Sequence, residues 1–240
     1  MSHHHETTGP CANERSFTTL RSLQPAASMT QIDRHDLAAR SEEILERVTV
    51  VFARKGFDGA SMQDLAAGAG MSVGNFYRYF PSKLALVEAL VERCMRDVQR
   101  DLAKVRDEPD FFVAFRRLIE INRESLVPEE AAIWVHVDAG AIRHPEIRAL
   151  REAMECGIRK EMFALLTREV EAGDPATVER LEEIADFLVV LVSGLFRRFA
   201  FGDREAERER FDRLTTLVID TARDRLDAVR VRHPLLDAAE

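Results

Sequence analysis

The sequence predicts an all-α protein. Apolar residues recur at spacings of three and four along most of the chain, and glycine and proline fall mainly at the breaks between these stretches. No segment alternates apolar and polar residues as a half-buried strand would. Apolar residues make up 46% of the 240 residues, which is ample for a packed core. We therefore expect a small N-terminal three-helix unit followed by a larger helical part.

The first predicted helix starts after Asp33 and ends at Lys55-Gly56, with Gly56 as its stop. Its core-facing side carries four apolar residues at helical spacing: Ile44, Leu45, Val48 and Phe52. The residues before it, 1–33, show no periodicity and are rich in Ser, Thr, Pro and His. Such a composition predicts a disordered N-terminal extension.

Two short helices and a turn come next. Ser61 can cap a helix over 62–68, with Asp64 at the third position to return the capping contact. Gly70 fits a turn that needs a positive φ, and Ser72 can cap a second helix that runs to about Tyr79. This order is typical of a helix-turn-helix, in which the second helix leaves its outer face exposed. That face carries small or polar groups able to approach base edges: Ser72, Val73, Asn75 and Arg78.

The remainder reads as long helices separated by Pro and Gly. Their predicted starting points are Pro81-Ser82, Asp107-Glu108-Pro109, Pro128, His144-Pro145 and Asp174-Pro175, and a last helix follows Gly202-Asp203. We expect domain boundaries at 34–83 for the helix-turn-helix unit, 84–230 for the larger helical domain and 231–240 for a tail.

Charge is distributed unevenly along the chain. The net charge is −8, but residues 34–83 hold seven Lys/Arg and six Asp/Glu, whereas residues 84–240 hold 25 and 33. The near-neutral helix-turn-helix unit over residues 34–83, called the reading unit below, can still bind DNA if its few cations face phosphate, although the domain that follows it is acidic. Three scattered cysteines without a Cys-x-x-Cys pair favour a reducing compartment, so we expect a cytoplasmic protein.

Other classes of site are not supported by the sequence. The segment Gly68–Gly74 has glycines spaced G-x-G-x-x-x-G, but a dinucleotide-binding loop needs a preceding strand. His136 and His144 lack a third metal ligand nearby, and no set of ionisable residues suggests a catalytic centre. We expect neither a metal, nor a cofactor, nor an enzyme.

The segment 57–83, FDGASMQDLAAGAGMSVGNFYRYFPSK, resembles the N-terminal domain of the tetracycline-repressor (TetR) family. The ungapped match covers roughly residues 38–90. The resemblance implies a DNA-binding transcription regulator. It implies that Ser61 and Met62 start a helix crossing the DNA backbone. The major-groove side would hold Val73, Gly74 and Asn75, and the phosphate side would hold Tyr77, Tyr79 and Lys83.

Asn75, Arg78 and the main chain near Gly74 are the candidates for base reading, because phosphate contacts position a protein without specifying sequence. Some of these DNA-contacting residues have a simpler interpretation. Arg78 could be an ordinary solvated side chain, and either Tyr77 or Tyr79 could belong to the core. Of the pair, Tyr77 is the one we expect both to pack and to reach phosphate.

The resemblance also implies a homodimer, since two-fold protein symmetry matches a palindromic operator. The last two long helices are the predicted interface, with eight apolar residues at helical spacing: Leu181, Ile184, Leu188, Leu191, Leu195, Phe211, Leu214 and Val218. The same residues could instead face the subunit's own core.

The resemblance further implies a pocket among the middle helices of the larger domain, and we expect it to take a small apolar or amphipathic effector. Its candidate lining combines soft or aromatic walls with two polar groups: Met95, Phe115, Asn122, Trp134, Asp138, Met154 and Met162. Binding there would release DNA, which makes the chain a ligand-released repressor. The alternatives are a helix-turn-helix protein without small-molecule input, either architectural or controlled by a protein partner, and, more remotely, a helical enzyme.

Overall fold

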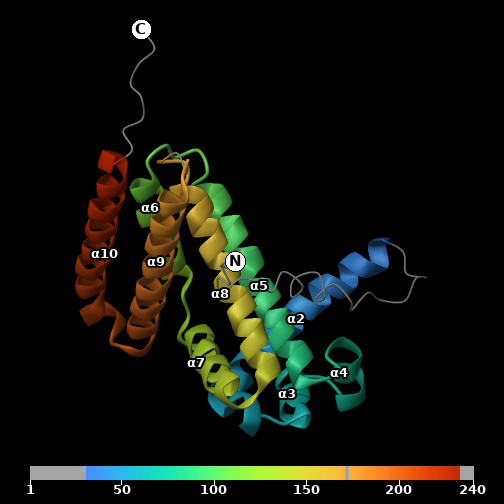
Figure 1. Cartoon of the computed structure of the whole chain (residues 1–240). Coiled ribbons are helices and arrows are strands. Elements are labelled where there is room, and N and C mark those ends of the chain that lie inside the picture. The colour runs from blue at the N-terminus through green and yellow to red at the C-terminus, as the bar shows by residue number, and fades with distance from the viewer. Residues whose placement is uncertain (1–30, 171–172, 233–240) are drawn as a thin grey trace, which may run out of the picture. The chain divides into compact units, whose positions relative to one another are not determined.

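The computed structural model describes residues 31–170 and 173–232. Within these ranges it contains nine helices and no strand, which confirms the predicted all-α class (Figure 1). In chain order they are α2 (Gln31–Gly59), α3 (Met62–Gly68), α4 (Val73–Tyr79), α5 (Lys83–Lys104), α6 (Phe111–Ser125), α7 (Pro128–Arg143), α8 (Pro145–Leu166), α9 (Pro175–Phe201) and α10 (Arg204–Arg232).

Most predicted helix ends agree with these bounds, because capping residues and prolines mark them. Asp110 caps α6 by accepting from the backbone amides of Phe112 and Val113, and Asp174 caps α9 ahead of Pro175. The predicted disordered extension lies outside the described residues, except for Gln31–Asp33, which begin α2. The predicted tail likewise lies outside them from residue 233 onward, and α10 reaches Arg232.

The chain packs into two compact units. The first comprises the residues up to Cys94 together with Ala132–Cys156, and the second comprises Met95–Ala131 together with the residues from Gly157 onward. The division therefore falls inside α5, α7 and α8, not between residues 83 and 84 as predicted from the sequence. Apolar periodicity shows that a helix has a buried face, but it does not show which core that face joins.

The core of the first unit joins α2–α4 to parts of α5, α7 and α8. Its fully buried side chains include Phe52, Leu65, Phe76, Leu86, Ile133 and Ile147. The backbone of α2 kinks at Gly56, whose φ of 70° is left-handed, and one further turn follows to Gly59. The regular part of α2 thus ends where the sequence predicted, since glycine adopts this φ without a steric penalty.

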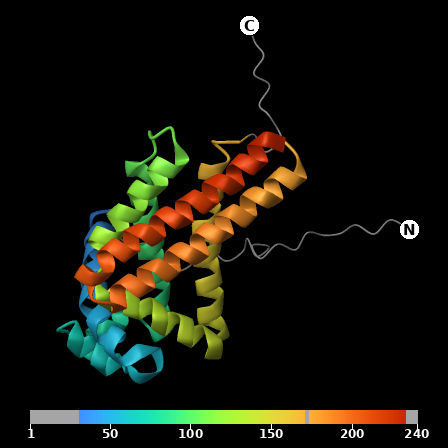
Figure 2. The same ribbon diagram turned by 90° about the vertical axis from the view of Figure 1, so that its left-hand side faces the viewer.

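The core of the second unit is formed mainly by α6, α9 and α10. The rings of Phe111 and Phe115 stack with centroids 5.5 Å apart, and Phe199 lies 5.0 Å from Phe211. Helices α9 and α10 run side by side in opposite directions, joined by the short break around Gly202 (Figure 2). None of the described helices is both long and apolar enough to cross a membrane.

Candidate nucleic-acid interface

The start of α3 is fixed by a reciprocal cap between Ser61 and Asp64. The hydroxyl of Ser61 accepts from the Asp64 backbone amide at 3.1 Å, and the Asp64 carboxylate accepts from the Ser61 amide at 3.0 Å. Lys55 of α2 adds an ion pair to Asp64 at 2.6 Å. These donors, with the Lys55 contact foremost, lower the pKa of Asp64 below its ordinary value. The sequence-predicted capping box is therefore present, and it ties α3 to α2.

The turn between α3 and α4 depends on Gly70, whose φ is 69°. The Met71 amide donates to the Ala66 carbonyl at 2.9 Å, and the Gly70 amide donates to the Ala67 carbonyl at 3.0 Å. This pair of bonds is a Schellman motif, which satisfies the last carbonyls of α3. The turn sets the direction in which α4 leaves α3, and its predicted positive φ is confirmed.

Helix α4 has one buried side and one exposed side. Phe76 is fully buried and its ring lies 5.6 Å from that of Phe80. Ser72 caps the helix by accepting from the Asn75 amide at 3.3 Å. The residues on the opposite side are exposed: Gly74, Asn75, Tyr77 and Arg78. A short, polar, open helix face of this kind fits the major groove of DNA.

Gly74 stands out because the fold does not require it. A Cβ at this position would meet nothing within 4 Å, and its φ is not left-handed. Helix interiors disfavour glycine relative to alanine by about 1 kcal/mol. The fold alone therefore gives no reason for glycine here, whereas close approach of an external surface to the backbone would.

The two tyrosines of α4 are arranged differently from the prediction. Tyr77, expected to pack, is 46% exposed, whereas Tyr79 is half-buried and packs against the first unit's core. The reason is the helical phase: Tyr79 follows Phe76 by three residues and so shares its buried side. Val73 and Met62 also pack partly against this core, while Ser61 and Ser72 are exposed.

Lys83, predicted to touch phosphate, already has an intramolecular partner. Its ammonium donates to the Phe57 carbonyl at 2.6 Å and lies 4.8 Å from the centre of the Phe57 ring. These contacts join the N-terminal end of α5 to Phe57, just after the α2 kink. An ammonium carries three donors, so two remain for another acceptor.

Helix α7 and His144, the residue that follows α7, contact the segment around the α2 kink at Gly56. His136 lies against Gly56, and Asp58 accepts hydrogen bonds from Arg143 and, at 2.9 Å, from His144. These bonds, the His144 contact first, lower the pKa of Asp58. The sequence predicts no structural contact for either histidine. Their partners lie more than 80 positions away, and no local pattern signals such a contact.

The family model of the bacterial regulatory proteins of the tetR family matches residues 44–90, which include the capped α3, the Gly70 turn and α4. Residues 44–90 therefore form a helix-turn-helix domain of the TetR type, and the chain is similar to transcriptional regulators that carry this domain. Regulators of this family bind DNA and act as dimers.

Individual relatives are transcriptional regulators of the helix-turn-helix type. An uncharacterized regulator of the helix-turn-helix type from Bacillus subtilis, YfiR, is 25% identical over 169 residues, which is 69% of this chain and 82% of the relative. The regulator UidR of Escherichia coli is 29% identical over 111 residues, which is 45% of this chain. The matched segment spans only about half of UidR, 54% of its length.

Solved structures show the same fold. GusR of Salmonella enterica aligns with a TM-score of 0.60 at 22% identity, covering 79% of this chain and 96% of GusR. A regulator from Saccharomonospora viridis, solved in complex with choline, aligns with a TM-score of 0.57 at 22% identity, covering 82% and 97%. Both likenesses extend the TetR-like architecture beyond the helix-turn-helix.

The residues predicted to line an effector pocket fall in two separate cores. Phe115 and Met162 are buried in the second unit's core, whereas Trp134 and Met154 pack against the core of the first. The two polar groups have partners inside their own units, since the Asn122 amide donates to the Leu118 carbonyl and Asp138 accepts from Arg151 at 2.8 Å. Met95 is half-buried at the start of the second unit.

Most of the residues predicted to form the dimer interface lie in the chain's own core. Six are buried there: Leu181, Ile184, Leu188, Leu195, Phe211 and Val218. Leu214 packs partly against the same core, and Leu191 is 38% exposed. The alternative interpretation, that these stripes face inward, thus describes them better. The exposed apolar residues of α9 and α10 are others: Val190, Phe201 and Leu217, at 59%, 57% and 61%.

Proposed function

We propose that the chain is a homodimeric repressor that binds a palindromic operator and releases it when a small effector binds. The observation that carries the proposal is the exposed side of α4, where Gly74, Asn75 and Arg78 stand clear of the core. Neither hydrophobic packing nor an ion pair with another described residue accounts for Arg78. An open face of this chemistry, set on a rigid turn, is what base reading in the major groove requires.

The proposed contacts divide into two kinds. Asn75 and Arg78 read base edges beside the backbone of Val73 and Gly74, since their side chains are long enough to reach into the groove. The remaining contacts go to the sugar-phosphate backbone and position α4: Ser61, Met62, Ser72, Tyr77, Tyr79 and Lys83. Of the two tyrosines Tyr77 is the more exposed, and Tyr79 and Lys83 reach phosphate from partly buried positions.

The proposed dimer forms through α9 and α10. Val190, Leu191 and Leu217 expose apolar surface on this antiparallel pair. Two such pairs related by a two-fold axis make a four-helix interface, which would bury this surface and place two copies of α4 on successive major grooves.

The proposed effector is a small apolar or amphipathic molecule. The support is the apolar core of the second unit, which includes Phe115 and Met162, and the regulator from Saccharomonospora viridis that holds choline in its structure. Because binding is reciprocal, an effector that weakens operator binding is itself bound less tightly by the operator-bound protein.

The test is selection of genomic fragments by the purified protein, followed by operator titration. We expect a short palindrome, and we expect Asn75→Ala to lose its enrichment while Gln99→Ala, which removes an exposed amide of α5, retains it. Retention that is diffuse and easily reversed by salt would instead support an architectural DNA binder. To test the effector, operator-bound protein is titrated with a panel of amphipathic compounds, and we expect at least one of them to release the operator. If none does, control by a protein partner is favoured over control by a small molecule.

A further inference from the structure

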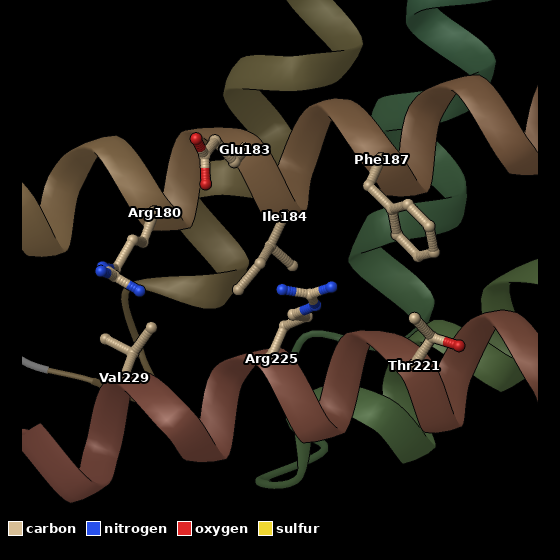
Figure 3. A pocket seen from close by; sticks show the side chains of 7 residues that line it. All are labelled: Arg180, Glu183, Ile184, Phe187, Thr221, Arg225 and Val229. Carbon is tan, nitrogen blue, oxygen red and sulfur yellow. The ribbon is translucent and has the colours of Figure 1, made fainter.

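A groove runs between α9 and α10 on the second unit (Figure 3). It encloses about 230 Å³ and has an apolar floor with charged side chains above it. Its lining comprises Arg180, Glu183, Ile184 and Phe187 of α9, with Thr221, Arg225 and Val229 of α10. Figure 3 shows Ile184 pointing toward Arg225 across the groove, and Glu183 directly precedes Ile184 on α9, so these residues lie at the same level of the helix pair.

The charges of this groove have no ion-pair partners among the described residues. Arg180, Glu183 and Arg225 form none, although the neighbouring Arg230 pairs with Glu169 at 2.5 Å and with Asp227 at 3.1 Å. Figure 3 shows the Arg225 guanidinium between the two helices and the Glu183 carboxylate turned away from it. The face therefore presents unpaired charges of both signs.

The groove belongs to the outer side of the helix pair. The neighbouring side of α10 is occupied by α6, because Arg116 bonds to Thr216, Arg123 pairs with Asp212 and Arg223 covers the Phe112 ring. The groove residues of α9 continue at helical spacing into Val190 and Leu191, and those of α10 continue into Leu217. Groove and exposed apolar surface thus form one face.

We infer that this groove receives the same face of a second copy of the chain, with Arg225 paired to Glu183 of the partner subunit. The inference rests on the proposed dimer and adds its charge contacts. A two-fold interface must be self-complementary, so a face with unpaired charges of both signs can satisfy both by meeting itself.

The pairing follows from the geometry of a four-helix bundle. In a bundle whose two-fold axis runs along the helices, neighbours are antiparallel, so α9 of one copy lies beside α10 of the other. Such an axis preserves the level of each residue along the bundle. Arg225 and Glu183 share a level within one chain and therefore meet across the interface, once in each direction. Arg180, one turn from Glu183, flanks the same pair.

The test uses two charge reversals of the full chain, Arg225→Glu and Glu183→Arg, with the molar mass measured by sedimentation over a dilution series. Each variant alone places like charges opposite each other twice, and we expect its dimer dissociation constant to rise at least tenfold over wild type. Mixed together, the two variants regain opposite charges at both contacts, and we expect heterodimers of near wild-type affinity. The matched control is the pair Arg117→Glu and Glu120→Arg on exposed positions of α6, which should change nothing.

The outcomes separate this inference from the proposed dimer. Recovery in the mixture supports the inference and shows that both variants fold. If single reversals dimerise as wild type does, or if the mixture fails to recover, the charge pairing is refuted while the dimer stands. A wild-type chain that stays monomeric at every concentration refutes the dimer and this inference together.

Discussion

The ring nitrogen Nε2 of His136 lies 2.9 Å from the backbone carbonyl of Ala53, so a side chain of α7 is hydrogen-bonded to the last regular turn of α2. The same ring fills the space beside Gly56, where a Cβ would come within 2.8 Å of Nδ1. The kink of α2 is therefore held by a left-handed glycine and by the imidazole packed against it. Because α2 is joined to α3 of the helix-turn-helix through Lys55 and Asp64, this contact also stabilises the reading unit.

Replacing Gly56 should consequently be costly. We expect Gly56→Ala to lower the free energy of unfolding by about 1–3 kcal/mol, because the new methyl group imposes a strained φ and displaces the His136 ring. Gly59→Ala is the matched control, since its Cβ would meet only the Lys55 Cβ at 3.8 Å. Urea denaturation of both variants measures the difference. Equal stability of the two would show that the kink carries no strain for alanine.

Gly74→Ala should separate folding from DNA binding. With open space around the new methyl group, we expect unfolding to become harder by about 0.5–1 kcal/mol, as for other glycines replaced within helices. The methyl group would also push α4 away from the base edges, and we expect operator affinity to fall at least tenfold. Denaturation and operator titration on one sample give both values. Undiminished affinity would remove the backbone at Gly74 from the interface.

Arg78 can be assigned to bases or to phosphates by its salt dependence. If it reads a base, Arg78→Ala should cost about 1–3 kcal/mol and relax preference at one operator position. We expect this result because Arg78 lies on the same exposed side as Asn75. Affinity would be measured at several salt concentrations on operators varied base by base, with Arg117→Ala as the control. A uniform loss with a salt slope smaller by about 1 would assign it to phosphate instead.

Asp64 should contribute to the fall in the free energy of unfolding at acidic pH. Its pKa is lowered from an ordinary value of 3.8 by the Lys55 and Ser61 hydrogen bonds, so the folded state favours the charged carboxylate. The resulting stabilisation is present above the unfolded-state pKa and is lost as pH falls through the folded-state value. We expect the stability of wild type to fall more steeply than that of Asp64→Asn between about pH 5 and pH 2. Glu120→Gln controls for loss of an exposed carboxylate, and parallel curves for wild type and Asp64→Asn would contradict the assignment.

The helix boundaries and the reading unit were accessible from sequence because their signals are local. Ser61 with Asp64, Gly70 and the proline-marked helix starts each act over a few residues, and the structure confirms them. Contacts that depend on tertiary packing were not accessible. The hydrogen bond of His136 to Ala53, beside the α2 kink, joins residues 83 positions apart. Apolar periodicity likewise could not show that Leu188 faces the chain's own core while Val190 faces outward.

Lys83 remains the residue whose two roles are best separated by experiment. Its ammonium stabilises the chain through the Phe57 carbonyl and ring, and its remaining donors are available to a phosphate. We expect Lys83→Met to lower the free energy of unfolding by about 1 kcal/mol and to reduce the salt slope of operator binding by about 1. Denaturation gives the first value, and titrations at several salt concentrations give the second. If stability falls while the salt slope is unchanged, Lys83 acts only within the protein, and the phosphate contacts must come from exposed groups such as Tyr77.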